Sequence, residues 1–158
     1  MQNQFQIHTT PVGPVCIVQQ GDAIVQLSFG DTQPSGAQPG HTPLLTEGIR
    51  QLDAYFSGTL REFSLPLRPS GTEFQRAVWQ ALTEIPYGET RTYGEIAHRV
   101  GNPRACRAVG SANHCNPIAI VVPCHRVIGV NGKLTGYAGG LHIKQALLAL
   151  EQRGNTGR

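Results

Sequence analysis

The sequence predicts two domains of different class, an α/β domain over residues 1–70 and a mainly α-helical domain with a helix-turn-helix over residues 71–158. Three observations predict this division. Residues 5–29 are apolar or alternate between apolar and polar side chains, as strands do. Several segments of the second half repeat apolar residues at helical spacing instead. Between them, Arg68-Pro69-Ser70-Gly71 is typical of a domain boundary.

In the first half we expect strands at Cys16–Val18 and Ala23–Phe29. Asp31–Pro43 contains three prolines and two glycines, which predicts a surface loop. Leu44–Ser57 predicts a helix with one buried stripe, because its apolar residues are spaced four, three and four apart. Phe63–Leu67 is expected to be a short extended segment.

The second half predicts helices with recognisable start signals. Threonines stand at two helix starts, where a hydroxyl can cap the first backbone N–H groups. Gly101-Asn102-Pro103 forms a tight turn between two helices, which is the helix-turn-helix pattern. The expected helices run to Leu82 after a cap at Thr72, over Tyr93–Val100 after a cap at Thr92, over Arg104–Asn113 and over Leu141–Gln152.

Charge is distributed unevenly between the halves. Residues 1–70 have three arginines against five acids, a net charge of −2, and residues 71–158 have ten lysines and arginines against five acids, a net charge of +5. Between Arg91 and Arg126 there are five arginines and one acid, Glu95. A basic second half is compatible with a polyanionic partner, and equally with a solvated basic face that has none.

Cysteine use predicts a reducing compartment. The four cysteines include no Cys-x-x-Cys pair, so we expect no disulfide framework and a cytoplasmic protein. Cys16 lies in an apolar run and is expected to be a buried small hydrophobic residue. No secretory signal and no apolar run of about 18 residues is found, so we expect no membrane span.

The most informative stretch places a thiol at the end of an apolar segment. Ile118–Val122 predicts a buried strand, and Pro123-Cys124-His125-Arg126 follows it. Neighbouring positive charge lowers a thiol pKa and favours the reactive thiolate. The alternative is a core cysteine whose two neighbours point to solvent.

A proton acceptor for this thiol is available nearby. Because adjacent side chains do not face each other, His125 would take the Cys124 proton through a water molecule. A carboxylate would then fix the histidine tautomer. Of the five acids in this half, Glu151 on the last helix is the best placed to do so.

Pro123-Cys124-His125-Arg126-Val127 resembles the active-site signature of the O6-alkylguanine-DNA alkyltransferases, or methylated-DNA–protein-cysteine methyltransferases. Further blocks are similar in the family order over about residues 73–151, with weaker similarity in the first half. They are Phe74-Gln75-Arg76-Ala77-Val78-Trp79, Ile85-Pro86-Tyr87-Gly88, Thr92-Tyr93-Gly94-Glu95-Ile96-Ala97, Arg107-Ala108-Val109-Gly110, Asn116-Pro117-Ile118 and Gly136-Tyr137-Ala138-Gly139-Gly140.

The resemblance implies a role for each matching residue. Cys124 is the alkyl acceptor, His125 takes its proton through water, and Glu151 orients that histidine. Asn116 braces the active-site turn, and the Tyr93 hydroxyl donates to guanine N3. Arg107 fills the gap left by the flipped base, and the other expected DNA-binding residues are Thr92, Arg104, Ala105, Ala108, Gly110, Ser111 and Arg126. The expected alkylguanine pocket consists of Tyr93, Val127, Tyr137, Ala138 and Gly139.

The implied architecture is a ribonuclease-H-like N-terminal domain and a C-terminal domain with a winged helix-turn-helix. The implied function is suicide DNA repair, in which a monomer binds double-stranded DNA through the minor groove, flips O6-alkylguanine out and reacts once. O4-alkylthymine is a further possible substrate. No cofactor is expected. No metal is expected either, because His8, Cys16 and His41 are isolated and do not match the zinc ligands of some relatives.

Three other functions fit parts of the sequence. A non-catalytic lesion-binding protein would resemble this half but lack the acceptor, and Cys124 is present. A cysteine hydrolase needs an oxyanion hole and usually a histidine distant in sequence. A transcription regulator of this family would have an additional N-terminal zinc-cysteine domain, so repair alone is favoured.

Overall fold

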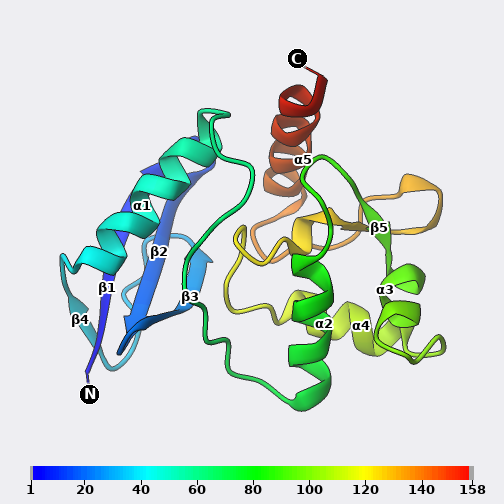
Figure 1. The fold of residues 1–158 in the computed structure, drawn as a ribbon, viewed down its shortest axis with the longest axis horizontal. Helices are drawn as coiled ribbons and strands as arrows, with labels where there is room; N and C mark the ends of the chain where they lie inside the picture. Colours follow the sequence, from blue (N-terminus) through cyan, green and yellow to red (C-terminus); the bar gives the residue numbers. More distant parts are fainter. Residues whose placement is uncertain (1, 157–158) are drawn as a thin grey trace. The chain divides into compact units, whose positions relative to one another are not determined.

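A computed structural model of the chain describes residues 2–156, with side chains described up to residue 154. The chain divides into two compact units (Figure 1). Unit 1 comprises the chain up to Pro69 together with Pro117–Ala119, and unit 2 comprises Ser70–Asn116 together with the chain from Ile120 onward. The main division falls inside the predicted boundary segment, whereas the return to unit 1 at residues 117–119 was not predicted.

Unit 1 is an α/β unit. Within its described residues it contains a four-stranded sheet and one helix: β1 (Asn3–Thr10), β2 (Gly13–Gln20), β3 (Ala23–Phe29), β4 (Ala37–Pro39) and α1 (Pro43–Phe56). The strand order is β3-β2-β1-β4, with antiparallel pairing among the first three strands of the chain and parallel pairing between β1 and β4. The predicted strands and helix are present, and β4 lies in the segment expected to be a loop.

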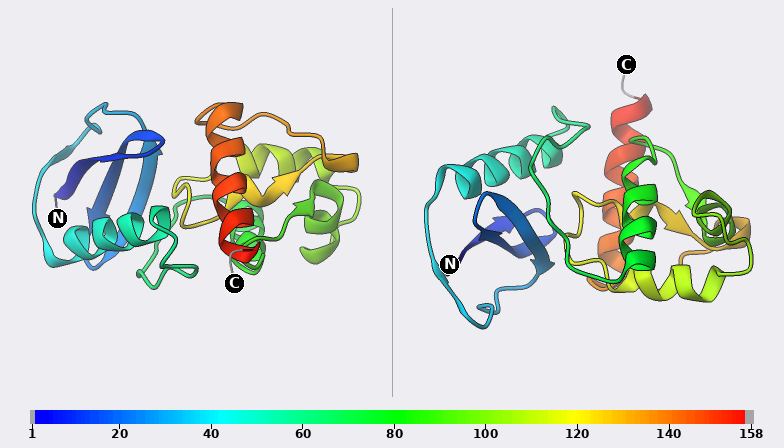
Figure 2. Two further views of the ribbon diagram at one scale, coloured as in Figure 1. Left: turned by 90° about the horizontal axis from the view of Figure 1, so that it is seen from above. Right: turned by 60° about the horizontal axis from the view of Figure 1, so that its bottom comes forward.

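Helix α1 lies along one face of this sheet (Figures 1 and 2). Its glycine allows a close approach, because a Cβ added at Gly48 would lie 2.6 Å from Cδ1 of Ile17 on β2. Side chains alternate across a strand, so the neighbouring Cys16 faces the other side of the sheet. There it is buried with Phe5 and Val18, which confirms the prediction for this cysteine.

The predicted strand at Ile118–Val122 is wrong. Leu27 on β3 donates its N–H to the carbonyl of Pro117 at 2.9 Å and accepts from the N–H of Ala119 at 2.9 Å, which makes one isolated bridge at Ile118. The chain then turns, with buried Ile120 at φ 71°. A β-branched residue rarely adopts this left-handed conformation, and it costs of order 1–3 kcal/mol. The run is therefore apolar because it is buried, not because it pairs along its length.

Unit 2 is mainly helical. Its described elements are α2 (Glu73–Thr83), β5 (Arg91–Thr92), α3 (Tyr93–Arg99), α4 (Cys106–His114), the 3₁₀ turn η1 (Cys124–Arg126), β6 (Val127–Ile128), the 3₁₀ turn η2 (Val130–Gly132) and α5 (Leu141–Thr156). β5 and β6 pair in parallel, and the loop after β6 is closed by a 2.7 Å bond from the N–H of Gly129 to the carbonyl of Lys133.

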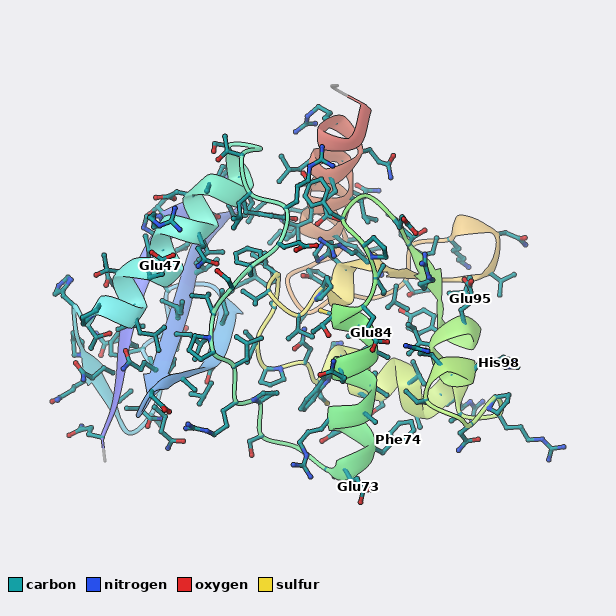
Figure 3. All side chains as sticks on the ribbon, viewed as in Figure 1. Glu47, Glu73, Phe74, Glu84, Glu95 and His98 are labelled. Atoms are coloured by element: carbon teal, nitrogen blue, oxygen red, sulfur yellow. The ribbon has the colours of Figure 1, made fainter. Side chains whose placement is uncertain are left out.

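The helix-turn-helix is formed by α3 and α4, both packed against α2. Thr72 and Thr92 cap α2 and α3 as predicted, each within a full capping box. The buried indole of Trp79 on α2 donates to the carbonyl of Ala112 on α4 at 2.8 Å. This bond fixes the last turn of α4 against α2. Figure 3 shows Glu73 and Glu84 at the two ends of α2 and Glu95 and His98 on α3.

None of the helices within residues 2–156 combines the length and the hydropathy needed to cross a membrane.

Candidate active site

Cys124 is held in a buried 3₁₀ turn by two asparagine side chains. The Nδ2 group of Asn116 donates to the carbonyl of Val122 at 2.8 Å, and that of Asn113 donates to the carbonyl of Cys124 at 3.3 Å. Asn113 lies near the end of α4, so this bond connects the turn to the second helix of the helix-turn-helix. The side chain of Cys124 is almost enclosed, with its residue 5% exposed.

The surroundings of the Cys124 sulfur act on its pKa in opposite directions. Burial raises the pKa of the thiol, because a thiolate is poorly solvated in the interior. Hydrogen bonds from the Asn116 amide and the Tyr137 hydroxyl, and the positive charge of Lys144, lower it. Burial has the larger effect, so the pKa of the Cys124 thiol is raised overall, and these three side chains reduce the cost of forming a thiolate.

His125, Arg126 and Glu151 form a buried cluster beside this turn. Nε2 of His125 lies 2.7 Å from Oε2 of Glu151, and the Arg126 guanidinium donates to both carboxylate oxygens at 2.8 and 3.0 Å. Burial by itself would raise the pKa of Glu151, but bonds and charge from His125 and Arg126 lower it to about 2. Glu151 is thus a carboxylate at neutral pH, and the structure brings it to His125 as the sequence suggested.

The protonation of His125 follows from these partners. Burial lowers the pKa of its imidazole, although the Glu151 carboxylate opposes this shift. A neutral ring beside a carboxylate carries its proton on Nε2 and donates it to Glu151. Nδ1 is then an acceptor, and this buried atom has no hydrogen-bond partner among the described residues.

The expectation that Arg126 contacts DNA is corrected by its position. The residue is 7% exposed, and its guanidinium is taken up by Glu151 and by the carbonyl of Ile85, to which Nη1 donates at 2.7 Å. It also lies over the ring of Tyr87, 5.7 Å from the centroid. Arg126 therefore fixes Glu151 and η1 from inside the unit.

The other predicted DNA-binding residues lie on or beside α3 and α4. Arg104, Arg107, Ala108 and Ser111 are exposed. Thr92, Ala105 and Gly110 are half-buried. Thr92 caps α3, and Ala105 precedes the first turn of α4. The exposed face of α4 therefore combines the small side chains of Ala108 and Ser111 with the charge of Arg107, and Arg104 lies just before the helix.

A shallow pocket of about 400 Å³ opens beside this face, lined by Tyr93, Cys106, Arg107, Gly110, His114, Thr135 and Gly136. The Tyr93 hydroxyl is hydrogen-bonded to that of Thr135 at 2.5 Å. Tyr93 and Arg107 thus share one pocket. The other predicted pocket residues, Val127, Tyr137, Ala138 and Gly139, do not line it; the first two are buried.

A larger hollow of about 780 Å³ lies at α2, β5 and α3, and its lining includes Glu84, Glu95 and His98, which Figure 3 labels. It is crossed by an exposed ion pair between Arg99 and Glu84 at 2.8 Å and contains no cysteine. The predicted nucleophile, Cys124, lies in η1 and does not line this hollow. Among the described residues, no group of three or more His, Cys, Asp or Glu side chains is arranged to hold a metal ion.

Three residues near the site were not predicted from the sequence: Asn113, Thr135 and Lys144. Lys144 had a detectable signal, because it precedes Leu147 and Glu151 by three and seven positions and so shares their inward stripe of α5. Asn113 and Thr135 carried no comparable signal, since their partners are distant in sequence.

Each half of the chain matches a known protein family model. Residues 5–69 match the family model described as 6-O-methylguanine DNA methyltransferase, ribonuclease-like domain, and residues 73–153 match that of 6-O-methylguanine DNA methyltransferase, DNA binding domain. The methylated-DNA–protein-cysteine methyltransferase of Methanosarcina acetivorans is 53% identical over 151 residues, covering 93% of this chain and 97% of that protein. The methylated-DNA–protein-cysteine methyltransferase of Mycobacterium leprae is 53% identical over 146 residues, covering 90% of this chain and 88% of that protein.

A solved structure agrees with this. The crystal structure of Mycobacterium tuberculosis OGT in complex with DNA matches with a TM-score of 0.89 and 48% sequence identity, over 96% of this chain and 94% of that chain. The predicted architecture, an α/β N-terminal domain followed by a mainly helical one, is confirmed by these matches and by the structure.

Proposed function

The chain belongs to the 6-O-methylguanine DNA methyltransferase family, and we propose that it repairs DNA by transferring the alkyl group of O6-alkylguanine to its own Cys124. The observation that carries this proposal is the buried Cys124 turn, with the His125–Glu151 pair directly beside it. The cysteine supplies a nucleophile, and the histidine supplies a neutral base whose orientation a carboxylate fixes.

The first step is loss of the Cys124 proton. With Nε2 of His125 donating to Glu151, Nδ1 is the ring atom that can accept a proton. His125 follows Cys124 directly, so we propose that one water molecule passes the proton between them. Glu151 remains ionised and stabilises the imidazolium that forms, in the manner of a catalytic triad carboxylate.

The transfer itself is a displacement at the alkyl carbon. A bond forms from the Cys124 sulfur to that carbon while the bond from the carbon to guanine O6 breaks. The electron pair of the broken bond stays on guanine, which takes up one proton. The products are a thioether at Cys124 and normal guanine in intact DNA, and these steps consume no cofactor. A thioether is a poor leaving group, so each molecule acts once.

Guanine must leave the duplex before this geometry is possible. O6 lies on the base-pairing edge, and rotating the nucleotide out costs about a few kcal/mol. We propose that Arg107 fills the resulting gap and that the Tyr93 hydroxyl donates to guanine N3 as negative charge develops. Their common place in the 400 Å³ pocket supports a joint role.

The slender face of α4 supports binding from the minor groove. An ordinary helix is about 10–12 Å across and the groove about 6 Å wide, so small exposed residues reduce the mismatch. The exposed Ala108 and Ser111 meet this need, and Arg104 supplies charge for phosphates. Contacts of this kind give little sequence preference. Four unpaired cysteines in the structure support a reducing compartment, and we propose the cytoplasm.

Mass measurement after incubation with a duplex containing one O6-methylguanine tests the proposal. One methyl group should appear on the peptide that contains Cys124, and Cys124→Ser should abolish the transfer. Cys115→Ser, at an exposed cysteine near the same turn, is the matched control and should react normally. Binding without any methyl transfer would instead identify a non-catalytic lesion-binding protein.

A further inference from the structure

The loop after β6 brings one hydroxyl group to the side chain of Tyr93. Oγ1 of Thr135 lies 2.5 Å from the Tyr93 hydroxyl oxygen, although the two residues are 42 positions apart in the sequence. Both line the pocket of about 400 Å³ beside α4, together with Arg107. No second hydrogen-bond partner for the Tyr93 hydroxyl is found among the described residues. The contact with Thr135 therefore decides where this hydroxyl points.

The ring of Tyr93 is fixed by contacts that leave its hydroxyl hydrogen free to rotate. Tyr93 is the first residue of α3, directly after the Thr92 cap. A Cβ added at Gly110 on α4 would lie 3.9 Å from Cε1 of the ring, so the ring packs over this glycine. These contacts fix the plane of the ring, but a hydroxyl hydrogen turns about its own bond to suit its partner. A hydrogen bond is needed to fix its direction.

Thr135 is held in place by groups other than its hydroxyl. Its carbonyl accepts a hydrogen bond at 3.4 Å from Nζ of Lys144, which is buried on α5. Its Cγ2 methyl group lies near Gly129, where an added Cβ would be 3.4 Å away. Gly129 closes the loop through its bond to Lys133. The backbone and the methyl group of Thr135 are thus positioned by the loop and by α5, and its hydroxyl is available to Tyr93.

The two hydroxyl groups together have one hydrogen to spare. Each carries one hydrogen, so one of the two lies between the oxygens and the other is free for a third group. When Thr135 donates to Tyr93, the spare hydrogen is that of the phenol, and it must point away from Thr135. N3 of guanine lies on the minor-groove edge of the base and can accept it.

We propose that Thr135 is a positioning residue, which donates its hydroxyl hydrogen to the phenol oxygen of Tyr93 and so directs the phenol hydrogen to N3 of the flipped guanine. The inference rests on the proposed function, in which Tyr93 donates to N3. Thr135 acts through Tyr93 and exchanges no atom with the substrate.

The second hydroxyl also makes the phenol a stronger donor during the transfer. As the bond from the alkyl carbon to O6 breaks, its electron pair stays on guanine and negative charge spreads to N3. The phenol hydrogen is drawn toward N3, and negative charge develops on the phenol oxygen. The hydrogen bond from Thr135 stabilises that charge, because hydrogen bonds in a chain polarise one another. Thr135 should therefore affect the rate of transfer and not the affinity for DNA.

The test is single-turnover methyl transfer from duplex DNA with one O6-methylguanine, at saturating protein. Thr135→Val removes the hydroxyl and keeps a methyl group beside Gly129. It should slow the transfer about 3- to 10-fold, the effect of one hydrogen bond, and leave the affinity for the duplex unchanged. Thr135→Ser should restore the rate, and Thr83→Val, at an exposed threonine of α2, should leave it unchanged.

Three measurements separate this role from a structural one. In a Tyr93→Phe background, Thr135→Val should cause no further loss, because it acts through the missing hydroxyl. With O6-methyl-3-deazaguanine, in which C–H replaces N3, both single variants should react as fast as the wild type. Alkylation of Cys124 by iodoacetamide, which involves no guanine, should be equally fast in Thr135→Val and in the wild type. If Thr135→Val does not fold, Thr135→Ala takes its place.

An unchanged rate of Thr135→Val on O6-methylguanine, or an equal loss of rate on the 3-deaza base, would overturn the inference. Independent losses that multiply in the double variant would overturn it as well, and so would an equal loss of iodoacetamide reactivity. Absence of methyl transfer by the wild-type protein would instead contradict the proposed function, and this inference with it.

Discussion

Replacing Glu151 by glutamine tests the buried ion pair that fixes η1. The side chain keeps its shape and loses its charge, so Arg126 and His125 remain buried beside a neutral amide. Removing one partner of a buried pair costs about 3–5 kcal/mol, because the other charge is left uncompensated. For a chain of this length that lowers the melting midpoint by about 6–20 °C, at ~2–4 °C per kcal/mol.

The same change should alter the response to acid. The pKa of Glu151 is lowered from an ordinary 4.5 to about 2. A depressed carboxyl pKa adds stability that is complete above the unfolded-state pKa and is lost as the pH falls through the folded-state pKa. The shift corresponds to about 3 kcal/mol at ~1.4 kcal/mol per unit. The difference in unfolding free energy between wild type and Glu151→Gln should therefore shrink by about this amount between pH 5 and pH 2.

Urea unfolding at a series of pH values measures both effects. The chain has one tryptophan, Trp79, which is buried in α2 and reports on unit 2. Glu47→Gln is the matched control: Glu47, labelled on α1 in Figure 3, also has a pKa lowered to about 2, but by an exposed pair with Arg50 in unit 1. A loss below about 1 kcal/mol in Glu151→Gln at pH 7, the range of an exposed pair, would refute the reasoning.

Three further predictions follow from other parts of the molecule. Arg107→Ala should slow repair of duplex DNA far more than reaction with free O6-benzylguanine, whereas Arg104→Ala should slow duplex repair only until DNA is saturating; equal losses on both substrates in Arg107→Ala would indicate a damaged pocket. The logarithm of the affinity for undamaged duplex should fall linearly with the logarithm of salt concentration, by about 0.9 per neutralised phosphate, and a salt-independent affinity would contradict electrostatic binding. Gly48→Ala should lower the free energy of unfolding by about 1–3 kcal/mol, because the added Cβ would collide with Ile17. The added Cβ of Gly94→Ala lies no nearer than 3.8 Å to its neighbours, so this change should be neutral or stabilising, and equal effects of the two substitutions would contradict this packing.

Local signals were sufficient for most helices and their starts. Thr72 and Thr92 each accept a hydrogen bond from a backbone N–H three residues further along the chain. Helical periodicity is likewise a property of the segment itself. β4 carried no such signal, because its three residues include Pro39 and form a strand only by pairing with β1. At Ile118 the sequence indicated burial correctly and strand pairing wrongly. Burial from all sides and extended pairing produce the same apolar run.

The site was predictable to the extent that it depends on a contiguous motif. Pro123-Cys124-His125-Arg126 placed the nucleophile and the base, but it did not reveal where each side chain points. In this 3₁₀ turn the side chains of His125 and Arg126 both bond to Glu151 on α5, which packs against the turn. That geometry converts a presumed DNA contact into an internal ion pair.

The pairing of Pro117–Ala119 with β3 restricts how this protein can be recombined with its relatives. The chain passes between the units at three places, after Pro69, after Asn116 and after Ala119. A chimera joined at residue 70 would bring the Ile118 segment of one parent to the β3 edge of another. Ile118 is completely buried, so its shape must suit the foreign strand. A chimera should therefore take residues 117–119 from the same parent as residues 1–69. The exchanged part then consists of two separate segments of the sequence.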